Sequence, residues 1–568
     1  MGFLGRVDSF LRTKESRFRD INETNQKWGN EDLDPTGPSQ RTWISWSYFA
    51  FFWAVSFNPV QWNTGASLVN QGLLWWQALL SILVGNLFTA TCLVLNSRAA
   101  AVYHIGMPVY MRVSAGYYLS FFFIFIRGSV AIIYCATQNY YAGRMMDVLL
   151  RAAFGHNWTD LPNHLPASAG ITSPQMGAFW IFFVIQFPFM FIHPHNQKWF
   201  YYLKSFIAPP VMVGIFGFMV GKNHGLTGAI ALTKPVSSSA QGWAFMAGIN
   251  SVAGSVVTEI VSNPDLARYA KKPSAAGWPQ GLAIFMSKSF VIFMGIASSA
   301  AARTMYGTAY WNPWDLFDAI LDHNWDAGAR TAIFLASVVQ IFAIIATNLA
   351  SNCVPTASDL TGLFPRYFNL KRGQVFCVVL SLACVPWKII ASAQSFLTFL
   401  GSYVCFLGPI LAITITDYFI IRKGNIHIPS VYNGSTSSPY WYWHGFNWRM
   451  AIAWIAGFAI TIHGLAGSYN IHFSQVSKHM YSLGFPLATT TSAVFYYTLN
   501  RIWPVPIYPP EREGEVKSFE ALGKTDGFFD DEVSPEEVVP VIIDGVDGIE
   551  SGPFDYDSKM AHSKEVNF

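Results

Sequence analysis

Charge is scarce in this chain. Only 12% of its 568 residues are Asp, Glu, Lys or Arg, whereas soluble domains contain about 25%. Hydrophobic residues make up 52% of the chain, and the mean hydropathy is +0.30. This composition indicates a polytopic membrane protein whose main surroundings are the lipid bilayer. The formal net charge of +3 is too small to suggest that nucleic acid is a partner.

The motifs of many enzymes and of ATP-driven pumps are also missing. The chain has no G-x-x-x-x-G-K-[ST] phosphate loop, no H-E-x-x-H zinc motif and no nucleophile elbow. Its six cysteines fall in or beside apolar stretches without paired spacing, so we expect neither a disulfide framework nor a metal site. We therefore expect no enzyme activity and no cofactor, and a secondary transporter is the favoured class.

Long apolar stretches dominate what is present. A polar, basic segment (1–42) precedes them, and a Pro-rich and then acidic tail (503–568) follows them. We expect an all-α membrane core over 43–502, and a disordered tail with one short ordered patch around 538–543. Basic residues alternate between loops, which places both chain ends in the cytoplasm by the positive-inside rule. The twelve expected spans are 43–68, 73–95, 117–141, 176–192, 200–220, 242–261, 281–301, 331–349, 375–390, 396–421, 450–466 and 483–499.

Two of these stretches are interrupted. The first carries Ser56-Phe-Asn-Pro59 near its middle, and proline cannot donate a hydrogen bond within a helix. The sixth contains Gly254 and runs into Asn263-Pro264, five spans further on. Irregular backbone at membrane depth is tolerated only where it faces protein or a watery cavity, and paired broken helices are typical of transporters built from inverted repeats. The simpler alternative is a proline-kinked span that binds no ligand.

Polar side chains inside the spans are functional candidates, because they are expensive to place in lipid. Tyr134 and Gln138 are four residues apart and share a helix face, where they can stack on a flat heterocycle and bond its edge. Thr347 and Asn352 belong to a second polar concentration, at the end of the eighth stretch. The alternative for all four is a polar contact between helices.

Acidic and basic residues within the spans allow several interpretations. Glu259 in the sixth stretch is a neutral acid, a member of an ion pair, or a proton carrier. Lys204, Lys288, Lys388 and Asp417 lie nearer the expected ends, so we expect them to extend to the membrane interface.

An ordered series of short motifs extends from about residue 40 to about residue 505: Ser56-Phe-Asn58, Leu73-Leu-Trp-Trp-Gln77, Gln138 with Gly143, Asn263-Pro-Asp-Leu-Ala-Arg-Tyr269, Ser351-Asn-Cys353, Asp359-Leu-Thr-Gly-Leu-Phe-Pro-Arg-Tyr367, Lys371-Arg-Gly373, Pro386-Trp387, Asp417-Tyr-Phe and Phe446-Asn-Trp-Arg449. The series resembles the nucleobase–cation-symport-1 family, in particular its fungal Fur-type branch of uracil, allantoin and uridine permeases. The resemblance implies a LeuT-like fold, with two inverted five-helix repeats followed by two extra helices. It also implies transport of one flat heterocycle per cycle, driven by a cation gradient.

The same resemblance implies a substrate site. Tyr134 falls where the family usually has a stacking tryptophan, and Gln138 and Asn352 fall on its substrate-binding Gln and Asn. Asn58 falls on a polar position that lines the site. Further implied positions are Gly254 and Ser255, near a second stacking Trp or a Lys, and Leu397, on the apolar gate at the start of the tenth span.

Cation coupling is expected to use protons. The family's sodium site maps onto the carbonyls of Ala54, Phe57 and Ala343 and onto hydroxyls at 346 and 347. Position 346 is alanine, and a hard cation that loses an oxygen ligand binds less tightly. We therefore expect proton coupling, with Glu259 as the carrier and Thr347 nearby.

The expected function is a proton-coupled symporter in the plasma membrane that imports uracil, allantoin, uridine or a purine. One alternative keeps the fold but carries thiamine or nicotinamide riboside. Another class is a transporter-like nutrient receptor that signals through its polar tail. An ion channel is disfavoured because no repeated filter loop is present. Ubiquitin-ligase machinery is a further expected partner, acting on the cytoplasmic ends.

Overall fold

The computed structural model describes residues 12–14, 16, 28–70, 73–225, 237–469, 474–509, 512 and 518–522, all within one unit, Met1–Gly523. Over these residues the chain is helical, and its β-structure is limited to two isolated bridges, Trp43 with Ala270 and Trp443 with Phe446. The expected ordered patch at 538–543 lies outside the described residues.

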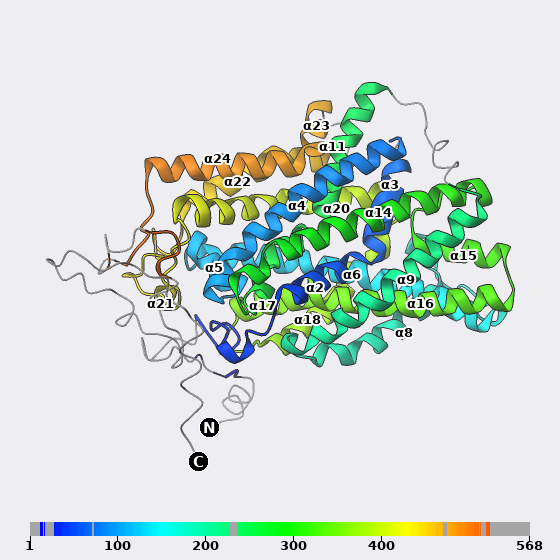
Figure 1. The fold of residues 1–568 in the computed structure, drawn as a ribbon, viewed down its shortest axis with the longest axis horizontal. Helices are drawn as coiled ribbons and strands as arrows, with labels where there is room; N and C mark the ends of the chain where they lie inside the picture. The colour runs from blue at the N-terminus through cyan, green and yellow to red at the C-terminus, as the bar shows by residue number, and fades with distance from the viewer. Residues whose placement is uncertain are drawn as a thin grey trace, which may run out of the picture. The chain divides into compact units, whose positions relative to one another are not determined.

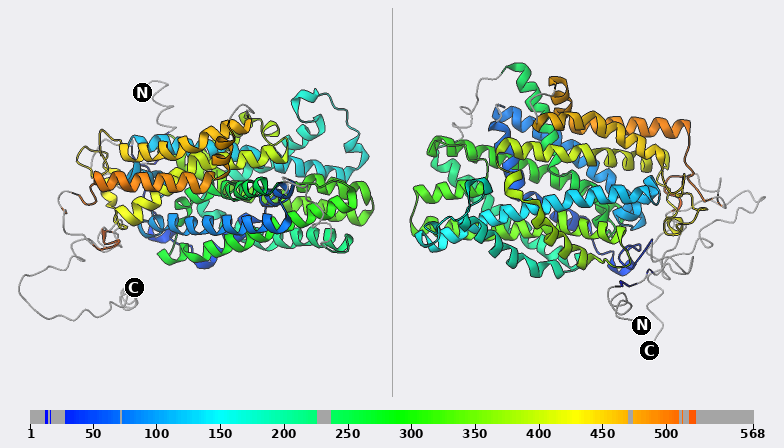
Figure 2. Two further views of the ribbon diagram at one scale, coloured as in Figure 1. Left: turned by 90° about the horizontal axis from the view of Figure 1, so that it is seen from above. Right: turned by 180° about the vertical axis from the view of Figure 1, so that it is seen from behind.

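Long helices lie side by side and form the body of the protein (Figures 1 and 2). In the described part of the chain, nine helical segments are long and apolar enough to cross a membrane. Their main helices are α4 (Trp75–Tyr103), α6 (Leu119–Phe154), α8 (Ser173–Gln186), α9 (Lys198–Lys222), α11 (Ser238–Gly254), α14 (Trp278–Tyr306), α16 (Ala327–Asn348), α20 (Ala393–Thr416) and α22 (Trp448–Tyr469).

Three of the twelve expected spans fall outside that group, so the number twelve stays a prediction. The first span is divided into α2 (Ser45–Ser56) and α3 (Pro59–Asn70). In the ninth span, α18 (Leu370–Ser381) has only 12 residues. The last span, α24 (Gly484–Ile502), carries three consecutive threonines and packs beside α22 at one edge of the body (Figure 1).

Short helices and turns join these segments. One group, with α5 and α21, lies at the end of the body opposite α15 (Figure 1). The connecting elements are η2 (Pro38–Gln40), α5 (Met107–Ala115), α7 (His156–Thr159), η3 (Ala167–Ala169), η4 (Phe187–Phe191), η5 (Pro194–Gln197), η6 (Pro273–Ala276), α15 (Pro313–His323), η8 (Leu382–Cys384), α19 (Pro386–Ile389), α21 (Ile428–Tyr432) and α23 (Gln475–Ser482).

The first helix break is confirmed. Helix α2 ends at Ser56 and α3 begins at Pro59. Between them the side-chain amide of Asn58 donates to the carbonyl of Val55 (2.6 Å), and its oxygen accepts from the N–H of Val60 (2.8 Å). Asn58 thus bonds backbone groups that the interruption leaves without helical partners, as buried backbone requires.

The second helix break is also confirmed. Helix α11 ends at Gly254, α12 (Val257–Ser262) begins after two residues, and α13 (Pro264–Ala267) follows. A Cβ added at Gly254 would lie 2.0 Å from the carbonyl oxygen of Leu400 on α20, which is closer than any side chain permits. Glycine is therefore required for α11 and α20 to approach each other this closely.

The eighth span contains a wider turn. Between α16 and α17 (Val354–Leu363), the π-helical segment η7 (Leu349–Cys353) carries Asn352. Such turns insert a residue into a helix and are frequent at functional sites.

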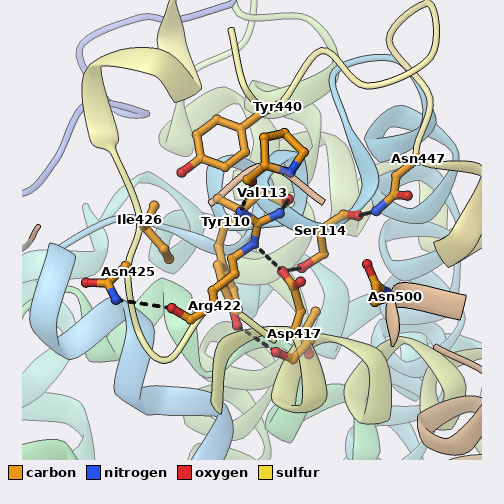
Figure 3. A network of polar contacts seen from close by, with 12 residues as sticks. Tyr110, Val113, Ser114, Asp417, Arg422, Asn425, Ile426, Tyr440, Asn447 and Asn500 are labelled. Carbon is orange, nitrogen blue, oxygen red and sulfur yellow. Dashed lines mark hydrogen bonds and ion pairs between the residues drawn. The ribbon is translucent and has the colours of Figure 1, made fainter. Parts of the chain in front are cut away.

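Asp417 is buried, so the expectation that it extends to the interface is wrong. It begins the π-helical segment η9 (Asp417–Ile421) and receives hydrogen bonds from Ser114 (2.9 Å) and Tyr496 (2.8 Å). The guanidinium of Arg422 also pairs with it at 2.9 Å (Figure 3). This network joins η9 to α5 and α24, and position in the sequence alone does not predict it.

Both polar ends of the chain contribute contacts near η9 and α5. The carboxylate of Glu520 pairs with Arg98 on α4 (2.6 Å) and accepts from the hydroxyl of Tyr418 (2.6 Å). Trp28 accepts a hydrogen bond from Arg112 at its carbonyl oxygen (2.7 Å). Residues 518–522, inside the tail that was expected to be disordered, therefore contact the core.

Candidate functional site

A polar cavity lies where both helix breaks face α6 and η7. Its volume is about 10 Å³, which is room for about one water molecule. Five of the six residues predicted to bind the substrate line this cavity, and their substrate-binding role stays a prediction. The lining residues are Asn58, Val60, Gln61, Tyr134, Gln138, Ser255, Thr258, Glu259, Ser351 and Asn352.

Gln138 and Asn352 present amides to this cavity. The oxygen Oε1 of Gln138 is buried and has no hydrogen-bond partner among the described residues. The Nδ2 group of Asn352 donates to Asn348 (2.9 Å), whose own amide donates to Asn139 on α6 (2.9 Å). An unpartnered buried acceptor costs about 1–3 kcal/mol, so a ligand N–H that reaches Gln138 would relieve that penalty.

Tyr134 connects the third span to the second helix break. Its hydroxyl donates to the carbonyl oxygen of Gly254 at 2.7 Å, where α11 ends. Its ring centroid lies 4.3 Å from that of Tyr403, with the planes 32° apart. Tyr403 therefore covers part of the ring expected to stack on a substrate.

Gly254 does not line this cavity, and its predicted place in the substrate site stays a prediction. Its backbone is committed to Tyr134 and to the close approach of Leu400. The neighbouring Ser255 does line the cavity, and its hydroxyl lies 3.3 Å from Oε1 of Gln61 on α3. Gln61 was missed by sequence reasoning, and its position three residues after Asn58 was the available signal.

Glu259 separates two cavities. It lines the central one and a second cavity of about 10 Å³, which Ser262, Asp265 and Ser351 also line. One of its carboxylate oxygens, Oε2, is buried without a hydrogen-bond partner in the described structure. The carboxylate is therefore positioned between the central cavity and the side of the protein that carries Asp265.

Lys204 and Lys288 are fully buried, so the expectation that they extend to the interface is wrong. The ammonium of Lys204 on α9 donates to the hydroxyl of Thr347 on α16, and that of Lys288 on α14 donates to the carbonyl of Val252 (2.7 Å). Both positive charges act on Glu259. Packing of α9 and α14 against neighbouring helices buries these lysines, and the sequence does not specify that packing.

Three of the expected sodium ligands, Thr347, Ala343 and Ala54, make hydrogen bonds within the protein. Thr347 donates to the carbonyl of Ala343 (2.9 Å) and also contacts the Lys204 ammonium. The carbonyl of Ala54 accepts from the N–H of Phe57 (3.1 Å). An ammonium at Thr347, together with the missing hydroxyl at 346, makes this donor set a poor fit for a hard cation.

Buried ion pairs surround Arg127 on α6. The guanidinium contacts Asp265 on α13 (3.0 Å) and also Asp359 on α17. All three side chains are buried, and a buried charge is tolerated when it is paired. This cluster holds together the elements around the second cavity.

On the α15 side, a larger cavity of about 530 Å³ lies outside the central one. Trp311, which lines it, packs against Phe396 with ring centroids 5.6 Å apart. Leu397, the predicted gate, is buried next to Phe396 on α20 and is absent from the lining of the central cavity. Lys388 is exposed and lines the larger cavity, which we name the vestibule; its lining is Tyr140, Arg144, Ser168, Gly170, Gln175, Trp311, Asn312, Trp314, Asp315, Trp387, Lys388, Ile390 and Ala391.

Two broken helices that meet at a polar cavity define a secondary transporter built from inverted repeats. A family model described as a permease for cytosine/purines, uracil, thiamine and allantoin matches residues 35–487. The chain belongs to this family, as the motif series predicted, and is therefore a permease and not an enzyme.

Similar proteins support the assignment. The allantoin permease of Saccharomyces cerevisiae is 33% identical over 84% of this chain and 76% of its own length. The uridine permease of the same yeast is 32% identical over 84% of this chain and 75% of its own length. The solved structure of Mhp1, a nucleobase–cation-symport-1 family transporter in a closed conformation with bromovinylhydantoin bound, superposes with a TM-score of 0.65. That match covers 86% of this chain and 99% of Mhp1 at 21% identity, and it confirms the LeuT-like fold.

Proposed function

We propose that this permease imports a nucleobase-related heterocycle such as uracil, allantoin, uridine or a purine, driven by the proton gradient. The observation that carries the proposal is the pair of amides, Gln138 and Asn352, that lines one small cavity between the two broken helices. The names of the allantoin and uridine permeases support this substrate class. We further propose a plasma-membrane location with both chain ends in the cytoplasm.

In this proposal the substrate enters through the vestibule. An N–H group of the heterocycle donates to Oε1 of Gln138, and Asn352 binds the opposite edge. Tyr134 provides a ring face and also holds the end of α11, so substrate contact and helix position are linked through one side chain. The cavity of about 10 Å³ has no room for a heterocycle, so the site must expand on binding and close again behind Phe396 and Leu397.

Proton coupling is favoured by the buried lysines. The side-chain amine of Lys204 donates to Thr347, where the family's sodium ligands were expected. Glu259 is the titratable group between the two cavities, and Lys204 (α9), Lys288 (α14) and Tyr134 (α6) are the groups that face it. Protonation of Glu259 would change the charge balance around both broken helices in each cycle, which is what a coupling group must do.

Uptake of labelled uracil, uridine, allantoin and thiamine in cells without their own permeases tests the proposal. We expect saturable uptake of a nucleobase-related compound that is faster at pH 5 than at pH 7.5 and unchanged when choline replaces sodium. Gln138→Ala should reduce that uptake at least tenfold at equal surface expression. Uptake that requires sodium, or that is unchanged in Gln138→Ala, would contradict the proposal.

The rival proposals have separate outcomes. Saturable uptake of thiamine or nicotinamide riboside alone would favour the vitamin-type cargo. Deletion of residues 524–568, which keeps the contacts of Glu520 with Arg98 and Tyr418, should leave uptake in place, whereas a nutrient receptor would lose a signalling response. Modification of the cytoplasmic ends by ubiquitin ligase remains a prediction about segments that lie largely outside the described residues.

A further inference from the structure

Three thiols from three different helices converge behind the central cavity. Cys135 on α6, Cys353 at the end of η7 and Cys377 on α18 are completely buried, and their sulfur atoms all lie within 4.8 Å of one another. We name this group the thiol cluster. The three residues are far apart in the sequence, so their spacing gave no sign of it.

The sulfur separations suit a single soft cation. Three thiolates around one ion, at metal–sulfur distances of about 2.3 Å, would lie about 4.0 Å apart in a plane. The observed separations need to shrink by less than about 1 Å to reach that geometry. Soft sulfur ligands select monovalent copper over hard cations. Zinc prefers four ligands, whereas this group offers three among the described residues.

The thiol cluster touches the substrate wall of the cavity. Cys353 directly follows Asn352, and Cys135 precedes Gln138 by one helical turn. The thiol of Cys377 donates to the backbone carbonyl of Asn352 at 3.9 Å. The side-chain nitrogen of Asn139 lies 3.8 Å from the sulfur of Cys135. The side-chain oxygen of Asn139 accepts a hydrogen bond from the amide of Asn348. An ion bound by these sulfurs would therefore act on the residues that hold Asn352.

We propose that the thiol cluster is a binding site for one thiophilic monovalent cation, Cu(I) or its analogue Ag(I), and that its occupation inhibits transport. The ion displaces protons from the thiols it binds, and the protons leave to water without any redox change. Coordination draws α6, η7 and α18 together. It also removes the hydrogen bond that the Cys377 thiol donates to the Asn352 carbonyl. The ion reaches the sulfurs through the central cavity when that cavity opens, because Asn352 lines the cavity and its carbonyl accepts from the Cys377 thiol.

Direct binding tests the site without reference to any substrate, so its outcome is independent of the proposed function. The full-length protein is purified in chloride-free buffer with Cys92, Cys384 and Cys405 replaced by alanine, which leaves only the thiol cluster. After equilibration with Ag(I) and desalting, mass spectrometry should find one silver ion per chain, and X-ray absorption should show sulfur ligands only. Absence of silver from this protein would overturn the proposal.

Single variants assign the ligands. Cys135→Ser, Cys353→Ser and Cys377→Ser, each added to the same background, should lower bound silver at least tenfold. Alanine replacements at the same positions provide a second set, since an apolar residue of similar size keeps the interior packed if serine disrupts it. Size-exclusion profiles confirm folding. Silver retained at one ion per chain in all three variants would place the ion elsewhere and reject the cluster.

A transport assay tests separately whether the bound ion inhibits uptake. Micromolar Ag(I) should block uptake by the background protein, and saturating substrate should change the rate of block because it changes how long the cavity is open. Cys353→Ala should shift the inhibitory concentration at least tenfold upward, whereas restoring Cys405 should not shift it. Equal inhibition of the Cys353→Ala variant would overturn the inhibitory role while leaving the binding result to be judged separately.

Discussion

The hydroxyl of Tyr134 donates a hydrogen bond to the carbonyl of Gly254 at the residue where α11 stops being helical. The two residues come from different halves of the predicted inverted repeat, and the bond connects the cavity wall on α6 to the second helix break. A tyrosine at this position therefore supplies both a ring for the cavity and a fixed partner for an unwound carbonyl. Phenylalanine would supply only the ring.

Tyr134→Phe tests this second role. Loss of one neutral hydrogen bond is worth about 1 kcal/mol, or roughly fivefold in an equilibrium. We expect the maximal uptake rate to fall by about that factor because the end of α11 loses its partner. A normal transport rate in this variant would show that the bond has no part in the cycle.

Gly254→Ala should abolish transport. The added methyl group would meet the Leu400 carbonyl at 2.0 Å, so α11 and α20 would have to separate. Gly214→Ala on α9 is the matched control, because an added Cβ there meets nothing within 4 Å. Surface expression and uptake measure the effect, and equal behaviour of the two variants would contradict the close approach.

Glu259→Gln should remove most of the pH dependence of uptake, because it replaces the carboxylate that lines both cavities with a group that does not titrate. Glu259→Asp should retain pH dependence with a lower rate. Initial uptake at five pH values between 5 and 8 provides the measurement. A Gln variant whose uptake still rises with acidity as in the unmodified protein would eliminate Glu259 as the proton carrier.

Lys204 and Glu259 should be energetically coupled. Neutralising either one leaves the other charge less well compensated in a buried environment, whereas neutralising both removes the imbalance. In a double-mutant cycle with Lys204→Met and Glu259→Gln, the apparent stability in detergent should deviate from additivity by about 0.5–3 kcal/mol. Lys204→Met combined with Asp318→Asn, on distant α15, should be additive. Additivity in both cycles would reject the coupling.

His104 should make the protein less stable in acid. Burial, together with the positive charge of Arg41, lowers the pKa of this histidine from 6.5 to about 3. Between these values the unfolded chain binds the proton and the folded chain does not, so stability present above pH 6.5 is lost as pH falls toward 3. His104→Asn should reduce that loss, and asparagine suits the left-handed backbone at φ 56°. Exposed His156→Asn is the control, with melting temperatures measured from pH 4 to 8.

The sequence predicted the fold because its main determinants are local. Pro59 and the residues around Gly254 interrupt helices through their own backbone chemistry, and both breaks occur where expected. Gln138, Asn352 and Ser255, which the family resemblance assigned to the substrate site, line one cavity, and their role in binding stays a prediction.

The errors concern long-range packing. Lys204, Lys288 and Asp417 were expected at the interface because they lie toward the ends of apolar stretches, yet neighbouring helices bury all three. Likewise, the thiol cluster depends on which helices pack together, and the spacing of cysteines along the sequence does not reveal that packing. Gln61 was missed because its partner, Ser255, lies on the other broken span.

The approach of α11 to α20 also affects how such a permease can change its cargo. Because that approach joins main chain to main chain, replacing Ser255, Gln61 or another cavity side chain leaves the contact between α11 and α20 untouched. Selectivity can then change at the wall of the cavity while the packing of these two helices is kept.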